Sequence, residues 1–310
     1  MPPTIDVLIV TTRARELVLS CLDHFARQTV PHTIYLADNA GNEDGTTDAV
    51  NERFPEVRVT TMPENRGFGK AMNQLASQGS GEIVVLANDD MDVEPRFLEK
   101  LVEPFEDSRV GMVAGMTLQP GDGNLVDGFG IELDRGLVAY NRLRHRHPDD
   151  TPGRLLGPSG GAAAYRRAAW EAMEGMDPRF FVYGEDVDLA LRLRLAGWDA
   201  AAAPDARGVH LGGATTGLDS PFQRRHSGFS RGFLLRRFGV LRSRSAPRAL
   251  AVEALTVLWG LVRFRTVLPL KARIEGWRAA GQTPRLDLPP GAIDESISLR
   301  ECLRRQRFER

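Results

Sequence analysis

The stretch IDVLIVTTRARELVLSCLDHFARQTVPHTIYLAD, residues 5–38, indicates the class of fold. It begins with an apolar run, which is typical of a parallel strand that is buried on both faces. Apolar residues then recur at four-residue steps at Leu17, Cys21 and Phe25, so an amphipathic helix is predicted next. A second strand follows and ends at Asp38. Strand, helix and strand in this order predict a βαβ unit with a right-handed crossover.

The same alternation continues along the first two thirds of the chain. Predicted next are, in order, a helix that begins at residues 46–48, a strand at 57–61, a helix from Gly67 to about Gly79, a strand at 82–95, a helix at about 95–105, a strand at 110–118, a short strand within 157–167, a helix, and a strand at 206–213. Residues 119–157 show no clear period, and we expect a long mobile loop there. The pattern predicts an α/β fold with a mostly parallel sheet flanked by helices.

A second stretch, FFVYGEDVDLALRLRLAGW at residues 180–198, supports two interpretations. Its leucines alternate from Leu189 to Leu195, as in a buried strand. Its leucine, alanine and arginine content favours a helix, with arginines in the last turn and a glycine just beyond it. We predict the helix. Glu185 and Asp186 at its start then act either as helix caps or as catalytic carboxylates.

The composition is that of a folded protein. The chain has 310 residues, of which 42% are hydrophobic, and can bury a substantial core. Cys21 and Cys302 are far apart and predict neither a disulfide framework nor a cysteine zinc site, which fits a reducing compartment. The N-terminal apolar run lacks the flanks of a signal peptide, so a first strand is expected there. Residues 254–262, the most apolar uncharged segment, are too few to span a bilayer, and no transmembrane helix is predicted.

Charge is distributed unevenly along the chain. The net charge is -1, but residues 221–310 contain 19 Lys and Arg against 7 Asp and Glu, so the rest of the chain carries -13. Residues 224–239 interleave arginine with apolar side chains, and residues 249–268 predict a long apolar helix. Such helices suit either an anionic membrane surface or the acidic body of the protein. The arginines would also suit nucleic acid, but no nucleic-acid-binding module accompanies them, so no nucleic-acid partner is expected.

Polar side chains cluster where the predicted strands end. Asp38 ends the second strand, Asn65 follows the third, and Asn88, Asp89 and Asp90 lie near the end of the fourth. In open α/β sheets, ligands bind outside the carboxyl ends of the strands. The sequence therefore predicts a ligand site at this edge.

Six stretches together resemble a known family. They are LADNAGNEDGT, PENRGFGKAMN, VLANDDMDVEP, GPSGGAAAYRR, FFVYGEDVDLALRLRLAGW and GVHLGGATTG. In this order they resemble inverting family 2 glycosyltransferases of the GT-A fold, most of all the bacterial rhamnosyltransferase branch, over about residues 5–217. The resemblance implies a GT-A, Rossmann-like catalytic domain at 1–217, with a nucleotide-binding half at about 1–95 and an acceptor-binding half at about 96–217. A basic helical extension follows at 218–310.

The resemblance implies a divalent metal site. Asn88, Asp89 and Asp90 stand where the family carries a DxD motif, with asparagine in place of its first aspartate. We expect Asp90 to be the principal metal ligand and His210 to complete the site. Mg²⁺ or Mn²⁺ would there neutralise the diphosphate of a sugar donor. The alternatives are an acidic turn at the strand end and a structural histidine.

The resemblance also implies a site for a dTDP- or UDP-linked sugar. Asp38 would accept a hydrogen bond from the ring N–H of the base, although an Asx-turn in LADNAG explains this residue equally well. The helix after Gly67 would turn its first N–H groups toward the diphosphate. The expected nucleotide-sugar ligands are Thr11, Asp38, Asn65, Gly67, Lys70, Asn88 and Asp89.

A catalytic base is assigned by the same resemblance. In inverting glycosyl transfer the attacking hydroxyl loses its proton as the new bond forms, and a positioned carboxylate can take that proton. By resemblance the base is Asp186, with Glu185 orienting the acceptor or the base. Gly160 and Gly161 would shape the acceptor cleft. The two histidines of the HRH segment, residues 145–147, are assigned no role.

The predicted function is transfer of a sugar, such as L-rhamnose, to a polyprenyl-linked or cell-surface glycan acceptor. We expect a cytoplasmic enzyme at the inner face of the plasma membrane, with residues 221–310 in peripheral contact with anionic lipids. A nucleotidyltransferase is an alternative, but it would need a glycine-rich loop after the first strand, and TTRARE has no glycine. A non-catalytic nucleotide-sugar-binding protein is another alternative. The sequence sets no oligomeric state.

Overall fold

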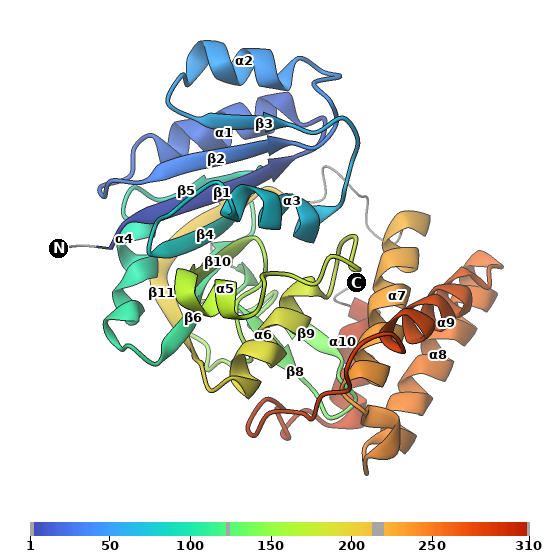
Figure 1. Cartoon of the computed structure of the whole chain (residues 1–310). Coiled ribbons are helices and arrows are strands. Elements are labelled where there is room, and N and C mark those ends of the chain that lie inside the picture. The colour runs from blue at the N-terminus through green and yellow to red at the C-terminus, as the bar shows by residue number, and fades with distance from the viewer. Residues whose placement is uncertain (1–2, 122–124, 213–219, 309–310) are drawn as a thin grey trace.

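A single large sheet forms the centre of the protein, with helices on its faces and a group of C-terminal helices to one side (Figure 1). The structure is a computed structural model that describes residues 3–121, 125–212 and 220–308. The strand order is β3-β2-β1-β4-β10-β6-β11-β5, with β7 beside β6. The bounds are β1 Ile5–Thr11, β2 Thr33–Asp38, β3 Arg58–Thr61, β4 Ile83–Asn88, β5 Met91–Val93, β6 Val110–Leu118, β7 Val126–Gly128, β10 Ala162–Arg166 and β11 Asp199–His210. The predicted α/β class is confirmed.

Both faces of β1 are buried, as its apolar run predicts. Val7 and Ile9 belong to a hydrophobic cluster with residues of α1 and α4, whereas Leu8 belongs to a second cluster with residues of α3. The helices of this half are α1 (Arg15–Phe25), α2 (Thr46–Arg53), α3 (Phe68–Ala76) and α4 (Phe97–Val102), followed by the 3-10 turn η1 (Glu103–Glu106). β1 pairs in parallel with β2 and β4, so the carboxyl ends of these strands meet at one edge of the sheet.

The prediction of a mostly parallel sheet holds for β3, β2, β1 and β4 and for the pair of β6 and β11. β10 runs antiparallel to both of its neighbours, β4 and β6, and β5 runs antiparallel to β11. The strand predicted at 82–95 is in fact two strands, because the chain turns at Asp89 and Asp90. After the turn, β5 pairs with β11 at the far edge of the sheet. The last strand is also longer than predicted and begins at Asp199. The sheet is therefore mixed.

Residues 119–157 do not form the structureless loop that their lack of period predicts. Their described part contains β7 and a small hairpin of β8 (Ile131–Leu133) and β9 (Ala139–Asn141). Many of its apolar side chains are buried, among them Val126, Phe129 and Leu143. Strands of three residues are too short to show a period of two, which explains why the pattern was missed.

The helical interpretation of residues 180–198 is confirmed, because α6 spans Glu185–Leu195. Leu189, Leu191 and Leu193 are all buried, and only Leu195 is substantially exposed, at 39%. The helix is enclosed by the sheet and by the C-terminal helices, whose residues share its hydrophobic cluster. A helix that is buried nearly all round has no polar face, so its leucines need not keep a helical period.

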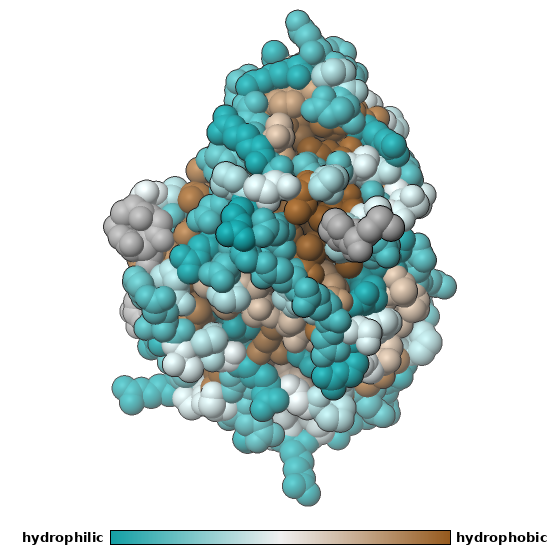
Figure 2. Space-filling model, turned by 90° about the vertical axis from the view of Figure 1, so that its left-hand side faces the viewer, coloured by the Kyte–Doolittle hydropathy of each residue, from teal (hydrophilic) through white to brown (hydrophobic). Residues whose placement is uncertain are grey.

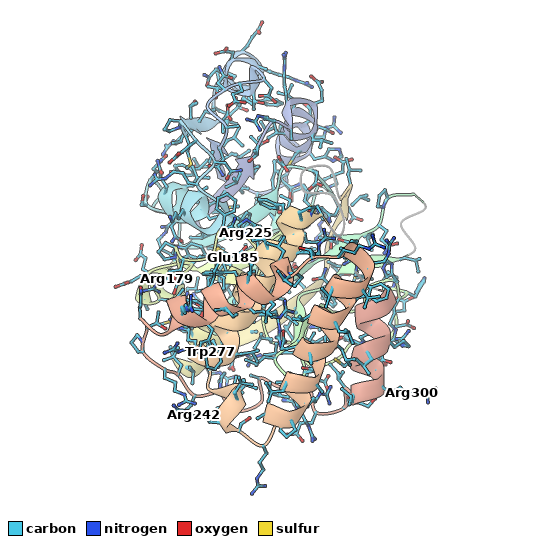
Figure 3. All side chains as sticks on the ribbon, turned by 90° about the vertical axis from the view of Figure 1, so that its right-hand side faces the viewer. Arg179, Glu185, Arg225, Arg242, Trp277 and Arg300 are labelled. Carbon is cyan, nitrogen blue, oxygen red and sulfur yellow. The ribbon has the colours of Figure 1, made fainter. Side chains whose placement is uncertain are left out.

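The C-terminal helices form one layer against the body of the protein (Figure 3). They are α7 (Pro221–Arg237), α8 (Ala246–Phe264), α9 (Leu268–Ala280) and α10 (Leu299–Phe308); α5 (Arg167–Ala172) belongs to the body. α7 and α9 pack closely at Gly232 and Gly276, where a Cβ atom would overlap the backbone of the facing helix. The predicted domain boundary between residues 217 and 218 lies outside the described residues.

Arginines of the C-terminal helices pair with carboxylates of the body. Packing against the acidic body is the alternative to membrane contact that the uneven charge distribution left open. Arg237 lies 2.6 Å from Asp177 and 3.3 Å from Asp188, and Arg248 lies 2.7 Å from Asp134. Asp134 and Asp188 are fully buried. On the face away from these helices the surface is mainly hydrophilic, with apolar side chains showing in its middle (Figure 2). Among the described helices, none has the length and hydropathy that crossing a bilayer requires.

Replacing Arg237 by alanine is expected to lower the free energy of unfolding by about 1.5–3 kcal/mol, because Asp177 and Asp188 would each lose one charged partner and keep the other, Arg179 or Arg192. Urea denaturation followed by circular dichroism measures the change. Arg242→Ala is the matched control, since Arg242 is exposed and should change stability by less than about 0.5 kcal/mol. Equal midpoints for both variants would show that this ion-pair cluster does not hold the layer to the body.

Candidate active site

A cleft of about 660 Å³ opens at the carboxyl ends of β1 and β4. Its walls come from the loops after these strands, the N-termini of α3 and α6, the end of β11 and the start of α7. The sheet edge at which a ligand site was predicted therefore carries a cleft. Of the predicted residues, those that line the cleft are Asn65, Gly67, Asn88, Asp89, Asp90, Gly160, Gly161, Glu185, Asp186 and His210.

Three predicted nucleotide-sugar ligands lie outside this lining, namely Thr11, Asp38 and Lys70. The Asp38 carboxylate is fully buried and accepts hydrogen bonds from the Ala40 N–H at 3.2 Å and the Thr47 hydroxyl at 2.8 Å. The first of these bonds is the Asx-turn that the sequence offered as the alternative. Lys70 is exposed on α3. The structure thus shows a local role for Asp38, and a role in base binding is untested.

Asp90 and His210 meet on one side of the cleft. Nε2 of His210 lies 3.2 Å from Oδ1 of Asp90 and 3.1 Å from Nδ2 of Asn88. Its other ring nitrogen, Nδ1, donates to Asp127 at 2.7 Å. The pairing of β11 with β5 produces this arrangement, because it sets His210 opposite Met91, the residue after Asp90.

The charges around His210 favour a cation at this point. Burial by itself would lower the pKa of His210, but hydrogen bonds to Asp127 and Asp90 outweigh burial and raise this pKa to about 10. The imidazole is therefore protonated at neutral pH, with its Nε2 proton facing Asp90. A divalent metal at the same point would replace that proton, and Asp127 would fix the ring, as carboxylates commonly do for metal-bound histidines.

The protein side chains at this point could hold Mg²⁺ or Mn²⁺ only if a bound substrate or water completed the coordination. Within the described ranges, no cluster of three or more His, Cys, Asp or Glu side chains has the arrangement of a metal site. Asp90 and His210 are two protein ligands, and such ions often take the rest from substrate phosphates and water. Burial also raises the pKa of Asp89 to about 6, with the Asp90 charge adding to the shift. Two carboxyl groups thus lie close together and largely buried on this side of the cleft, and a bound cation would stabilise their charged forms.

Glu185 and Asp186 also line the cleft, from the first turn of α6. Asp186 accepts from the N–H groups of Val187 at 2.8 Å and Gly160 at 3.3 Å, so its carboxylate is fixed in place. Within the described part of the chain, Oε2 of Glu185 is buried without a hydrogen-bond partner. Burial raises the pKa values of both carboxyl groups, and the Asp186 charge raises that of Glu185 further. Raised values suit a proton acceptor that works near neutral pH.

Glycines bring the two walls of the cleft close together. Gly67 has a φ of +83°, and a Cβ atom there would overlap the backbone of Phe181. The next residue, Phe68, donates its N–H to the Phe181 carbonyl at 2.7 Å. A Cβ at Gly161 would lie 2.9 Å from the Asn88 amide. The loop before α3 is thereby joined to the loop before α6.

Several polar residues of the cleft wall were given no role from the sequence, among them Asn39, Asp127, Asn141, Arg144 and His145. Asn39 follows Asp38 directly, donates to Asn65 and accepts from the Arg66 N–H. The other four lie in the region predicted to be a mobile loop, where no period marked them.

The chain is similar to known sugar-transferring proteins in sequence. Residues 2–227 match the family model described as glycosyltransferase-like family 2. An N-acetylglucosaminyl-diphospho-decaprenol L-rhamnosyltransferase from Mycobacterium tuberculosis is 32% identical over 219 residues, which cover 61% of this chain and 69% of the relative. The predicted resemblance to the family and to its rhamnosyltransferase branch is thereby confirmed.

Two solved structures show the fold. A mannosyltransferase from Pyrobaculum calidifontis, in complex with GDP-mannose and Mn²⁺, has a TM-score of 0.55 at 19% identity and covers 91% of this chain and 88% of its own. The structure of GalNAc-T7 with UDP, GalNAc and Mn²⁺ has a TM-score of 0.63 at 15% identity and covers 80% and 51%. The predicted GT-A fold is confirmed by these likenesses.

Proposed function

The chain belongs to glycosyltransferase family 2, and from this premise we propose that it is a metal-dependent, inverting enzyme that transfers a sugar from a dTDP- or UDP-linked donor to a polyprenyl-linked glycan acceptor. L-rhamnose is the proposed sugar, because the relative from M. tuberculosis is named as an L-rhamnosyltransferase with a decaprenol-linked acceptor. The observation that carries the proposal is that Asp186 lines the same cleft as Asp90 and His210. The proposed base and the proposed metal ligands therefore border one space that a sugar can fill.

Asp186 is proposed to take the proton of the attacking hydroxyl. Its two backbone hydrogen bonds hold the carboxylate at the cleft wall, and its raised pKa makes it a better proton acceptor than an ordinary aspartate. Glu185 would orient the acceptor, because its unpartnered buried oxygen can accept a hydrogen bond from a second sugar hydroxyl. Gly160 and Gly161 line the cleft beside these carboxylates, where the acceptor ring would lie.

Asp90 and His210 would hold the divalent metal, which supplies positive charge to the leaving diphosphate. Asp127 would keep the His210 ring in the orientation that directs Nε2 into the cleft. Asn65, Gly67, Asn88 and Asp89 line the part of the cleft proposed for the nucleotide sugar. Three residues outside the cleft lining remain proposed contributors to nucleotide-sugar binding, namely Thr11, Asp38 and Lys70. Asn39, which lines the cleft, is added to the proposed binding residues.

The proposed division of labour follows the halves of the chain. Residues 1–95 would supply most of the donor side of the cleft and residues 96–217 the acceptor side, except that His210 and its partner Asp127 would act on the donor side through the metal. Residues 218–310 form the helical extension, and we propose that it also contacts anionic lipid at the inner face of the plasma membrane. Exposed apolar side chains on α8 support that contact.

A transfer assay tests the proposed function directly. The purified chain with Mn²⁺ is offered dTDP-L-rhamnose, UDP-glucose and UDP-N-acetylglucosamine, each with a prenyl-diphosphate-linked N-acetylglucosamine acceptor. We expect transfer from one of these donors, with inversion of the anomeric centre seen by nuclear magnetic resonance. Retention would contradict the single-displacement mechanism, and donor binding without transfer would favour the non-catalytic alternative.

A further inference from the structure

A second cavity, of about 340 Å³, lies between the hairpin of β8 and β9 and the helices α7, α8 and α9. It shares three wall residues with the active-site cleft, namely Asn141, Arg144 and Gln223. The two spaces are therefore neighbours with a common wall. The second cavity lies on the side of this wall toward the C-terminal helices.

The cavity combines cationic and apolar walls. Arg231 and Arg273 both pair with one carboxylate, Glu253, at 2.5 Å each, so two positive charges share one negative charge. The guanidinium of Arg224 lies 3.8 Å from the centre of the Phe264 ring, which keeps the cation at the wall. The apolar part of the wall includes Val138, Trp259, Phe264 and Pro269. Arginine clusters of this kind suit phosphate oxygens.

The apolar wall continues onto the outside of α8. Trp259 lines the cavity and is also 52% exposed, so it joins the interior to the surface. Leu255, Leu258 and Val262 recur beside it at helical spacing, and Val262 is 69% exposed. The acidic residue of α8, Glu253, is largely buried, whereas Arg263 at its other end is exposed. This outer face of α8, with Leu255, Leu258, Trp259 and Val262, is thus apolar with a cationic end.

We propose that the second cavity binds the diphosphate and first isoprene units of a polyprenyl-diphosphate-linked acceptor. This inference rests on the proposed function, because it places the acceptor sugar in the cleft beside Asp186. The diphosphate would then lie among Arg224, Arg231 and Arg273, and the hydrocarbon would leave along the outer face of α8. Each part of such an acceptor then has a matching wall: the cleft for the sugar, the arginines of the adjoining cavity for the anion, and the outer face of α8 for the hydrocarbon, with Trp259 shared by the last two.

Binding of farnesyl diphosphate to the full chain tests the site without any transfer. We expect saturable quenching of tryptophan fluorescence that is lost in Trp259→Phe, with affinity at least tenfold higher than for inorganic diphosphate or farnesol alone. Ser227 lines the cavity, and Ser227→Phe should fill it and weaken binding at least tenfold. Ser77→Phe, on the exposed end of α3, is the matched control and should bind normally. Equal affinity in the Ser227 and Ser77 variants would overturn the proposal.

A second measurement separates this inference from the proposed function. Transfer is assayed with a prenyl-diphosphate-linked acceptor and with octyl N-acetylglucosaminide, which has no diphosphate. We expect Ser227→Phe to raise KM at least tenfold for the first acceptor and to leave kcat/KM for the second unchanged. Absence of transfer by the unaltered chain would contradict the proposed function, whereas equal losses for both acceptors would contradict only the cavity assignment.

Discussion

Replacing Asp186 by asparagine is expected to lower kcat for sugar transfer by about 10²–10⁴-fold, the usual contribution of a general base. Asparagine keeps the shape of the side chain and can still accept a hydrogen bond from Val187, so the first turn of α6 should persist. It cannot take a proton at any accessible pH. Donor affinity should change little, because Asp186 is not among the residues proposed to hold the metal or the nucleotide sugar. Steady-state kinetics and titration calorimetry with the nucleotide sugar measure the two quantities.

Glu185→Gln is the matched control, since it changes the adjacent carboxyl group in the same isosteric way. We expect a smaller loss that is expressed mainly in the KM for the acceptor, because Glu185 is proposed to orient rather than to deprotonate. If Glu185→Gln abolished transfer while Asp186→Asn kept most of it, the two roles would have to be exchanged. Normal rates in both variants would remove this pair from the mechanism.

The first half of the fold could be predicted because its signals are local. β1 is a two-sided buried strand, and its neighbours β2 and β4 are joined to it through helices that show a clear period, so strand order and direction follow from general rules. The antiparallel direction of β10 depends on the path of residues 119–157, which have only short strands. No local pattern in Ala162–Arg166 distinguishes a parallel from an antiparallel strand.

The candidate site divides in the same way. Asp90, His210, Glu185 and Asp186 were named from motifs, and the structure brings them to one cleft. Asp127 was missed, although it holds His210, because the contact depends on the pairing of β7 with β6. For Asp38 the sequence left two roles open, an Asx-turn and a contact with the base. The structure shows the turn and a hydrogen bond from Thr47, and the contact with the base stays a prediction.

Chelation of divalent metal with EDTA is expected to abolish transfer, and added Mn²⁺ or Mg²⁺ should restore it. The physical reason is that Asn88, Asp89 and Asp90 form an acidic turn, which would repel a diphosphate unless a cation lay between them. Asp90→Ala should prevent rescue at any practical Mn²⁺ concentration. Full activity in EDTA would mean that protonated His210 alone supplies the positive charge.

Asp127→Asn tests the metal site by a route that does not depend on turnover. The Asp127 carboxylate accepts the Nδ1 proton of His210 at 2.7 Å, and replacement of such a partner typically weakens metal binding about 10–100-fold. Mn²⁺ affinity in the presence of a nucleoside diphosphate is measured by electron paramagnetic resonance. Asp92→Asn is the control, because Asp92 lies on β5 next to the site but pairs with Ser20. If both variants bound Mn²⁺ equally, Asp127 would be a partner of protonated His210 only, and the histidine would belong to the charge balance of the cleft instead of to the metal.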